Sequence, residues 1–128
     1  MKGFHANIEE ETLKNTDYRR VLYTAKHSQL VLMCLKPGEE IGEEVHELDQ
    51  FLRFEAGEGK AIINGTEYAV KHGDAVIVPE GARHNFINTG SVDLKLYTVY
   101  SPPAHLLDTL QPTKADEVED HFDGQTSE

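Results

Sequence analysis

The sequence predicts an all-β protein, and three observations support this fold class. Short stretches rich in β-branched and aromatic residues follow one another along most of the chain. Turn-forming glycines, prolines and asparagines separate these stretches, and no helical pattern lies between them. Many short strands in regular succession without intervening helices form a sandwich or a barrel rather than an α/β fold.

The expected elements can be placed in order along the chain. A Glu-rich run at residues 8–15 predicts one helix before the first strand. Asn64-Gly65 is a strong hairpin signal and suits a type I′ turn. Pro102-Pro103 ends the sheet, and residues 105–110 are expected to form a short helix. The expected strands lie at residues 18–25, 29–36, 50–55, 60–63, 66–70, 75–78, 84–88 and 92–100.

One of these strands differs from the others because it is apolar on both faces. Residues 30–35 read Leu-Val-Leu-Met-Cys-Leu. We expect this strand to be buried twice, either inside a sandwich or partly at a subunit contact. Cys34 is the only cysteine, which excludes an internal disulfide, and it is expected to be a buried small side chain rather than a reactive thiol.

Length and charge set the organisation and exclude some partners. The 128 residues are expected to form one domain over 1–128, with a barrel core at about 18–101 and an acidic tail at about 112–128. Only acidic charges follow Lys114, so we expect this tail to be a solvated helix or disordered. The net charge of −11 argues against nucleic acid and anionic membranes as partners, because those require clustered Lys and Arg.

The chain shows no sign of insertion into a membrane or of export. No apolar run approaches the length of a membrane span. The first residues contain no apolar signal region, so the expected location is the cytoplasm.

A turn between two apolar strands orients one histidine. Residues 73–88 read Gly-Asp-Ala-Val-Ile-Val-Pro-Glu-Gly-Ala-Arg-His-Asn-Phe-Ile-Asn. Pro79 fixes its own φ angle, and Gly81 can adopt the positive φ that a tight reversal needs. His84 is therefore expected at the start of the next strand, pointing in a defined direction. A histidine held by a rigid turn suits metal binding or acid–base chemistry.

An upstream segment, residues 38–57, supplies partners for this histidine. Glu44 and His46 are two residues apart, so on a strand their side chains point to the same face. Gln50 joins them if the strand continues in phase. Together with His84 the set contains two imidazoles and one carboxylate. This is the donor set of facial-triad metal sites, which leave positions open for substrate or dioxygen.

The two segments resemble the paired motifs of the cupin superfamily. The first family motif, G-x5-H-x-H-x3-E-x6-G, is matched in spacing, with Glu44 in place of its first histidine and Gln50 in place of its glutamate. Residues 58–72 separate the motifs, a spacing similar to that of compact microbial single-domain cupins, which include mannose-6-phosphate isomerase-like proteins. The resemblance implies a double-stranded β-helix, a jelly-roll barrel with short terminal helical segments. The second family motif, G-x5-P-x-G-x2-H-x3-N, is matched at every fixed position, by Gly73, Pro79, Gly81, His84 and Asn88.

The resemblance also implies a divalent metal ion held by Glu44, His46, Gln50 and His84. The usual family set is three histidines and one glutamate, so this chain keeps one carboxylate, loses one imidazole and gains an amide oxygen. The harder donor set favours Fe(II), Mn(II) or Zn(II) over copper, with Ni(II) as a further candidate. Asp49 replaces Gln50 as the candidate ligand if a bulge shifts the phase of the strand.

The expected site leaves three functions open. Leu52, Phe54, Phe86 and His105 are candidates to line a pocket around the ion, although the three apolar side chains also suit the core. The first function is a metal-dependent enzyme for a small polar substrate, either dioxygenase-like or sugar-isomerase-like. The second is a module that binds a small ligand without converting it, and the third is a purely structural polar network.

The resemblance further implies a homodimer.

Overall fold

The computed structural model describes residues 1–128 and confirms an all-β fold. Every expected strand is present, and one short strand is added near the end of the chain. The elements are α1 (Ile8–Lys14), β1 (Arg19–Thr24), β2 (Gln29–Leu35), β3 (Asp49–Ala56), β4 (Glu58–Ile63), β5 (Thr66–Lys71), β6 (Ala75–Val78), β7 (His84–Asn88), β8 (Leu94–Ser101), β9 (Leu110–Gln111) and the 3₁₀ turn η1 (Lys114–Asp116).

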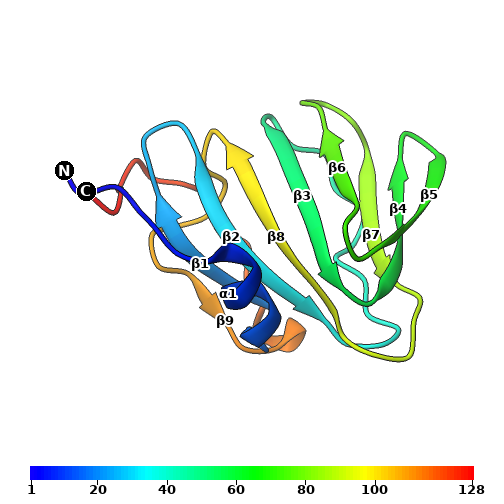
Figure 1. Cartoon of the computed structure of the whole chain (residues 1–128). Coiled ribbons are helices and arrows are strands. Elements are labelled where there is room, and N and C mark those ends of the chain that lie inside the picture. Colours follow the sequence, from blue (N-terminus) through cyan, green and yellow to red (C-terminus); the bar gives the residue numbers. More distant parts are fainter.

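The strands form two antiparallel sheets that pack as a jelly-roll sandwich (Figure 1). The larger sheet has six strands in the order β6-β3-β8-β2-β1-β9, and the smaller sheet has three in the order β5-β4-β7. Strands distant in sequence are therefore neighbours, as β3 and β8 are in the larger sheet. This arrangement brings residues near 45 and residues near 84 to the same end of the sandwich.

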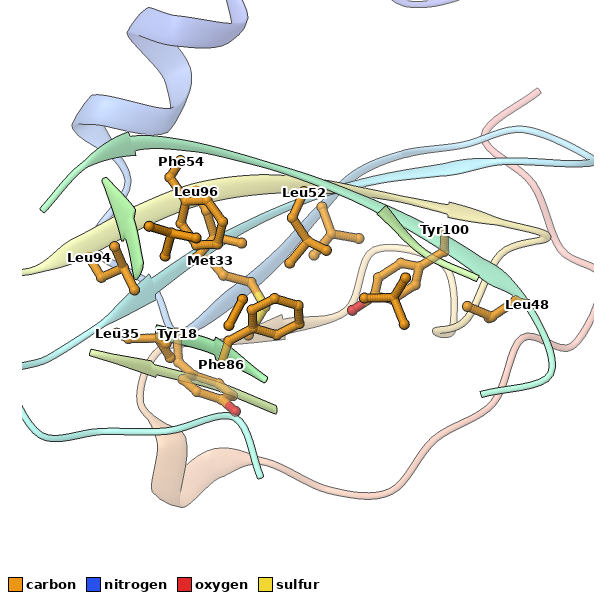
Figure 2. Close-up of a cluster of buried hydrophobic side chains, with 14 of the residues drawn as sticks. Tyr18, Met33, Leu35, Leu48, Leu52, Phe54, Phe86, Leu94, Leu96 and Tyr100 are labelled. Atoms are coloured by element: carbon orange, nitrogen blue, oxygen red, sulfur yellow. The ribbon is translucent and has the colours of Figure 1, made fainter. Parts of the chain in front are cut away.

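The core lies between the two sheets (Figure 2). Side chains that alternate along β2, β3 and β8 point into it, because successive residues of a strand face opposite sides. Phe54 and Leu96 are opposite each other on neighbouring strands, and Phe54 lies against Phe86 of the smaller sheet with ring centroids 6.2 Å apart. Leu52, Phe54 and Leu96 are fully enclosed.

Helix α1 packs against the outer face of the larger sheet, where it contacts β3 and β8. Asn7 caps the helix by accepting a hydrogen bond from the backbone N–H of Glu10 at 3.0 Å. Lys95, on the outer face of β8, donates to the carbonyl of Leu13 at 2.6 Å. Cys34 pairs with Lys95 across the strands and is buried, and this burial raises the pKa of its thiol to about 11. The expectation of an unreactive buried cysteine is confirmed.

The predicted hairpin turn is present, but the predicted helix at residues 105–110 is wrong. Asn64 and Gly65 have φ angles of 48° and 82°, as a type I′ turn requires. Residues 105–109 instead form a turn that leads into β9, which pairs with β1. The N–H groups of His105 and Leu106 bond to the side chains of Gln29 and Asp120, so distant partners hold the backbone in a non-helical path.

The acidic tail, residues 112–128, is neither a solvated helix nor disordered, which corrects the sequence-based expectation. It runs back along the barrel, where the N–H of Phe122 bonds to the carbonyl of Ala104 and the N–H of Ser127 to that of Thr24. Its carboxylates find partners on the barrel that a local charge count does not reveal. None of the helices has the length and apolar character of a membrane-spanning segment.

Candidate metal centre

Backbone pairing places Glu44 directly opposite His84. The N–H of each residue bonds to the carbonyl of the other at 2.9 Å, forming an isolated antiparallel bridge. Residues directly opposite in such a bridge project their side chains to the same face. Gly81 has a φ of 86°, and its N–H bonds to the carbonyl of His46 at 2.9 Å, which ties the turn to the other motif. The two motifs thus hold each other in register.

The structure brings the three expected donors together. Donor atoms of Glu44, His46 and His84 all lie within 4.8 Å of one another. Nε2 of His46 lies 2.7 Å from Oε2 of Glu44, and the two imidazole rings are 5.1 Å apart between centroids. His84 is buried, whereas Glu44 and His46 are half-buried. Two imidazoles and a carboxylate at this separation fit around one divalent cation.

The local hydrogen bond of His84 leaves the correct nitrogen free for a metal. Nδ1 of His84 lies 2.9 Å from the carbonyl oxygen of Ala82, and because a carbonyl only accepts, Nδ1 carries the proton. Burial lowers the pKa of His84 and outweighs the effect of this hydrogen bond, so the ring is neutral at pH 7. Nε2 therefore presents a lone pair, which is the usual arrangement of a metal-binding histidine.

Glu44 is ionised in this environment. Burial tends to raise its pKa, but the hydrogen bond and charge of His46, together with the charge of Arg19, lower it overall. Nε2 of His46 and Oε2 of Glu44 are within hydrogen-bond distance, at 2.7 Å. Metal binding requires unprotonated imidazole nitrogens and an ionised carboxylate, so it would become weaker as the pH falls.

Of the two alternative fourth ligands, Gln50 points inward and Asp49 does not. Gln50 is buried and donates from Nε2 to Oγ1 of Thr98 at 3.1 Å, while its Oε1 has no hydrogen-bond partner. Gln50 is opposite Tyr100, whose ring is 6.2 Å from that of His46. Asp49 is exposed and accepts from the N–H of Glu80 at 2.9 Å. A buried, unpaired amide oxygen on the inner face of the barrel fits a role as an additional metal donor.

A cavity of about 860 Å³ opens beside Glu44 and His46. His105, an expected pocket residue, lines it. Leu52, Phe54 and Phe86 do not line it. They belong to the hydrophobic core, where the ring of Phe86 lies 5.9 Å from that of His84, and their role around an ion stays a prediction. The remaining wall comes largely from residues 102–105 and from the C-terminal segment 117–122.

Sequence reasoning missed the charged groups that the barrel and the C-terminal segment bring to this cavity. Arg19 is inward-facing on β1, with only 4% of its side chain exposed, and it donates to Gln111 at 2.7 Å and to Glu117 at 3.1 Å. Arg19 is two residues before the apolar Val21, so the two side chains point to the same face of β1, which is buried. This spacing is the sequence feature that could have predicted the inward position of Arg19. Asp120 reaches His105 from the tail, and no local pattern in the sequence indicates that contact.

Tyr100 lies buried between two histidines of the cavity, His46 and His105. Its ring is edge-on to His46 at 6.2 Å and edge-on to His105 at 5.3 Å. Burial raises the pKa of its hydroxyl to about 12, so the group stays protonated at neutral pH. The cavity therefore combines two of the candidate metal donors, Glu44 and His46, with Arg19 and the imidazole of His105.

Comparisons with known proteins agree with this architecture. YrkC of Bacillus subtilis, an uncharacterized protein, is 44% identical over 124 residues, which cover 91% of this chain and 67% of YrkC. BH2720 of Bacillus halodurans, a solved structure, is 42% identical, with a TM-score of 0.88 over 90% of this chain and 92% of that one. A predicted oxalate decarboxylase of Thermotoga maritima is 29% identical, with a TM-score of 0.58 over 61% of this chain and 69% of that one.

The match to a family model covers both motifs and all the candidate metal donors. The model, described as a cupin domain, matches residues 31–100. This range extends from β2 to β8 and contains Glu44, His46, Gln50 and His84. The chain belongs to the cupin family of this model, Cupin_2.

Proposed function

We propose that this protein is a metal-dependent enzyme that acts on a small polar molecule in the cavity beside Glu44 and His46. The observation that carries the proposal is the convergence of three donors, from two distant segments, within 4.8 Å of one another. A set of three protein ligands leaves coordination positions open, as catalytic metal sites require. The cavity of about 860 Å³ provides room for a ligand at those positions.

The donor set supports Fe(II), Mn(II) or Zn(II), with Ni(II) as a further candidate. Glu44 supplies a carboxylate, His46 and His84 supply imidazoles, and Gln50 offers a neutral oxygen. When bound, such an ion polarises a carbonyl or hydroxyl group of a ligand. The hydrogen bond from His84 to Ala82 holds one imidazole in the required tautomer, and the backbone bridge to Glu44 holds the carboxylate beside it.

Both dioxygenase-like oxidation and sugar-isomerase-like isomerisation remain within the proposal, because each occurs among small cupins. The likeness to a predicted oxalate decarboxylase adds small carboxylates to the compounds to be tested. Arg19 at the cavity wall supports an anionic ligand, since a guanidinium binds carboxylates strongly. In the structure, Glu117 accepts a hydrogen bond from Nη1 of this guanidinium at 3.1 Å.

One observation favours the competing interpretation of a purely structural network. Nε2 of His46 and Oε2 of Glu44 lie 2.7 Å apart, so the two side chains can satisfy each other by a hydrogen bond. That interpretation predicts no metal, whereas a non-catalytic binding module predicts a ligand that raises the melting temperature and is recovered unchanged.

Metal analysis of the purified protein tests the proposal. The protein should be prepared without chelator and without a histidine tag, and its metal content measured by mass spectrometry. We expect close to one equivalent of a divalent transition metal in the wild type, and less than about a tenth of that in His84→Ala or His46→Ala. His72→Ala changes an exposed histidine outside the cavity and should keep the wild-type content. A metal-free wild type that cannot be reloaded, or unchanged content in His84→Ala, would contradict the proposal.

A further inference from the structure

His105 is positioned far more firmly than a residue after a strand end usually is. Gln29, itself buried, holds its backbone on both sides. Oε1 of Gln29 accepts from the N–H groups of Ala104 and His105 at 3.1 and 3.0 Å, and Nε2 donates to the carbonyl of His105 at 2.9 Å. The main chain at His105 is thus fixed from the centre of the larger sheet.

Asp120 fixes the ring of the same residue from the opposite direction. Its Oδ1 lies 2.7 Å from Nδ1 of His105, and both side chains are largely enclosed, at 7% and 13% exposed. Asp120 also accepts from the N–H of Leu106 at 3.1 Å and from Oγ1 of Thr109 at 3.0 Å. The carboxylate is therefore itself held in place, on a segment fifteen residues further along the chain.

This arrangement leaves one nitrogen of His105 available in the cavity. Nδ1 donates to Asp120, whereas Nε2 has no hydrogen-bond partner in the protein and is not sealed from solvent. Burial lowers the pKa of His105, and the charge of Arg19 lowers it further, which outweighs the opposing effect of Asp120. The ring is therefore neutral at pH 7, with its lone pair on Nε2.

We propose that His105, oriented by Asp120, transfers protons to and from the ligand that binds at the metal centre. The inference rests on the proposed function, because it needs a ligand in the cavity that Glu44, His46 and His105 share. A proton leaves an O–H, or a C–H beside a carbonyl, and bonds to Nε2. The electron pair stays on the ligand, and the Asp120 carboxylate stabilises the imidazolium that forms. The proton then returns to the same or to a neighbouring ligand atom, so the step needs no oxidant.

A purely structural role does not account for the pair. The bonds from Leu106 and Thr109 to Asp120 already attach the C-terminal segment to the barrel. Here a neutral ring with one free nitrogen faces a polar cavity, and its tautomer is set by a buried carboxylate, as in known acid–base pairs.

Solvent deuterium exchange into small carbonyl compounds tests the proposal. Zinc-loaded protein in D₂O is incubated with pyruvate, dihydroxyacetone and acetylacetone, and loss of the C–H signal is followed by proton NMR. We expect the wild type to exchange at least one of these compounds faster than metal-free protein does. His105→Gln should lower the rate by about 100-fold or more at unchanged zinc content. Asp120→Asn should lower it by at least about 10-fold, because the amide favours the wrong tautomer.

A second measurement and a control separate this role from a structural one. Nitrogen-15 NMR of the metal-free protein should show the proton of His105 on Nδ1 in the wild type and on Nε2 in Asp120→Asn. Tyr23→Phe removes a bond between β1 and Glu128 of the C-terminal segment, away from the His105–Asp120 pair, so it should keep the exchange rate. His105→Asn serves if His105→Gln does not fold.

The outcomes distinguish the two proposals. Wild-type exchange in His105→Gln, a proton on Nε2 of His105 in the wild type, or no exchange of any compound by zinc-loaded protein would overturn the role of His105. Failure of the wild type to bind zinc would instead overturn the proposed metal centre.

Discussion

Among the single residues of the candidate centre, Gln50 gives the clearest indication of a missing partner. Its Oε1 is buried and unpaired, and an unsatisfied buried acceptor costs about 1–3 kcal/mol of folding free energy. Proteins tolerate such a cost mainly at functional sites. Because Nε2 bonds to Thr98, the amide is held with its oxygen free for another partner.

Gln50→Leu should therefore separate stability from metal binding. We expect the metal-free variant to unfold within about 1 kcal/mol of the wild type, because the lost bond to Thr98 is offset by removal of the unpaired oxygen. Its affinity for Zn(II) or Mn(II), measured by competition with a chromophoric chelator, should fall about 10-fold or more. Thr98→Val keeps Oε1 and should change the affinity less. Equal affinity in Gln50→Leu and wild type would remove Gln50 from the ligand set.

Residue spacing was sufficient to predict the donors but not the walls of the cavity. Glu44, His46 and His84 follow from strand phase and from one rigid turn, which are local properties. Arg19 bonds to Glu117 of the distant C-terminal segment, and Asp120 of that segment bonds to His105. No single-sequence pattern encodes these contacts. The three apolar candidates, Leu52, Phe54 and Phe86, lie in the core, and a sequence pattern alone does not distinguish a core position from a pocket position on the same face.

At the scale of elements, the centre depends on how the β6–β7 turn is joined to the segment around Glu44. Gly81 combines a positive φ with a hydrogen bond to the carbonyl of His46. A side chain at such a φ costs about 1–2 kcal/mol. A shift of this turn would move His84 relative to Glu44 and His46.

Gly81→Ala should accordingly weaken both stability and metal binding. We expect a loss of about 1 kcal/mol or more in the free energy of unfolding and a clear fall in metal affinity. Gly73→Ala is a matched control: Gly73 has a φ of 93° and open space around it, and it lies in the turn before β6. It should lose similar stability and keep its metal affinity. If the two variants lost affinity equally, the turn would have no specific role in placing His84.

Strands were predicted well because their pattern is local, and irregular segments were predicted poorly because distant partners determine their conformation. Alternation of apolar residues is read directly from the sequence, and each expected strand appears within a few residues of its place. Residues 105–110 contain helix-compatible side chains, but their N–H groups bond to Gln29 and Asp120. Tertiary partners outweighed local propensity there.

For the whole molecule, the C-terminal segment closes the sandwich at the cavity and joins the two termini. Residues 117–122 line the cavity, and Glu128 accepts hydrogen bonds from the backbone of Lys2 and Gly3. The two ends of the chain lie next to each other (Figure 1). The acidic composition of the tail predicted a solvated or disordered segment. A count of charges does not reveal that Glu117 pairs with Arg19 and that Asp120 pairs with His105.

The homodimer stays a prediction at this scale. The apolar residues of β2 do not require a subunit contact, because Leu32 and Cys34 are already buried within the single chain. Tyr68 of β5 and Ile77 of β6 are exposed on the edge strands of the two sheets. Edge strands are the usual places where β-sheets pair between subunits.

X-ray absorption at the zinc edge of the reloaded protein tests the metal centre most directly, since it counts the imidazoles bound to the ion. The convergence of Glu44, His46 and His84 predicts two imidazoles, with Zn–N distances of about 2.0–2.1 Å, and oxygen for the remaining ligands. His84→Ala should leave one imidazole in whatever zinc it retains. A spectrum with no imidazole, or with three, would contradict the centre described above.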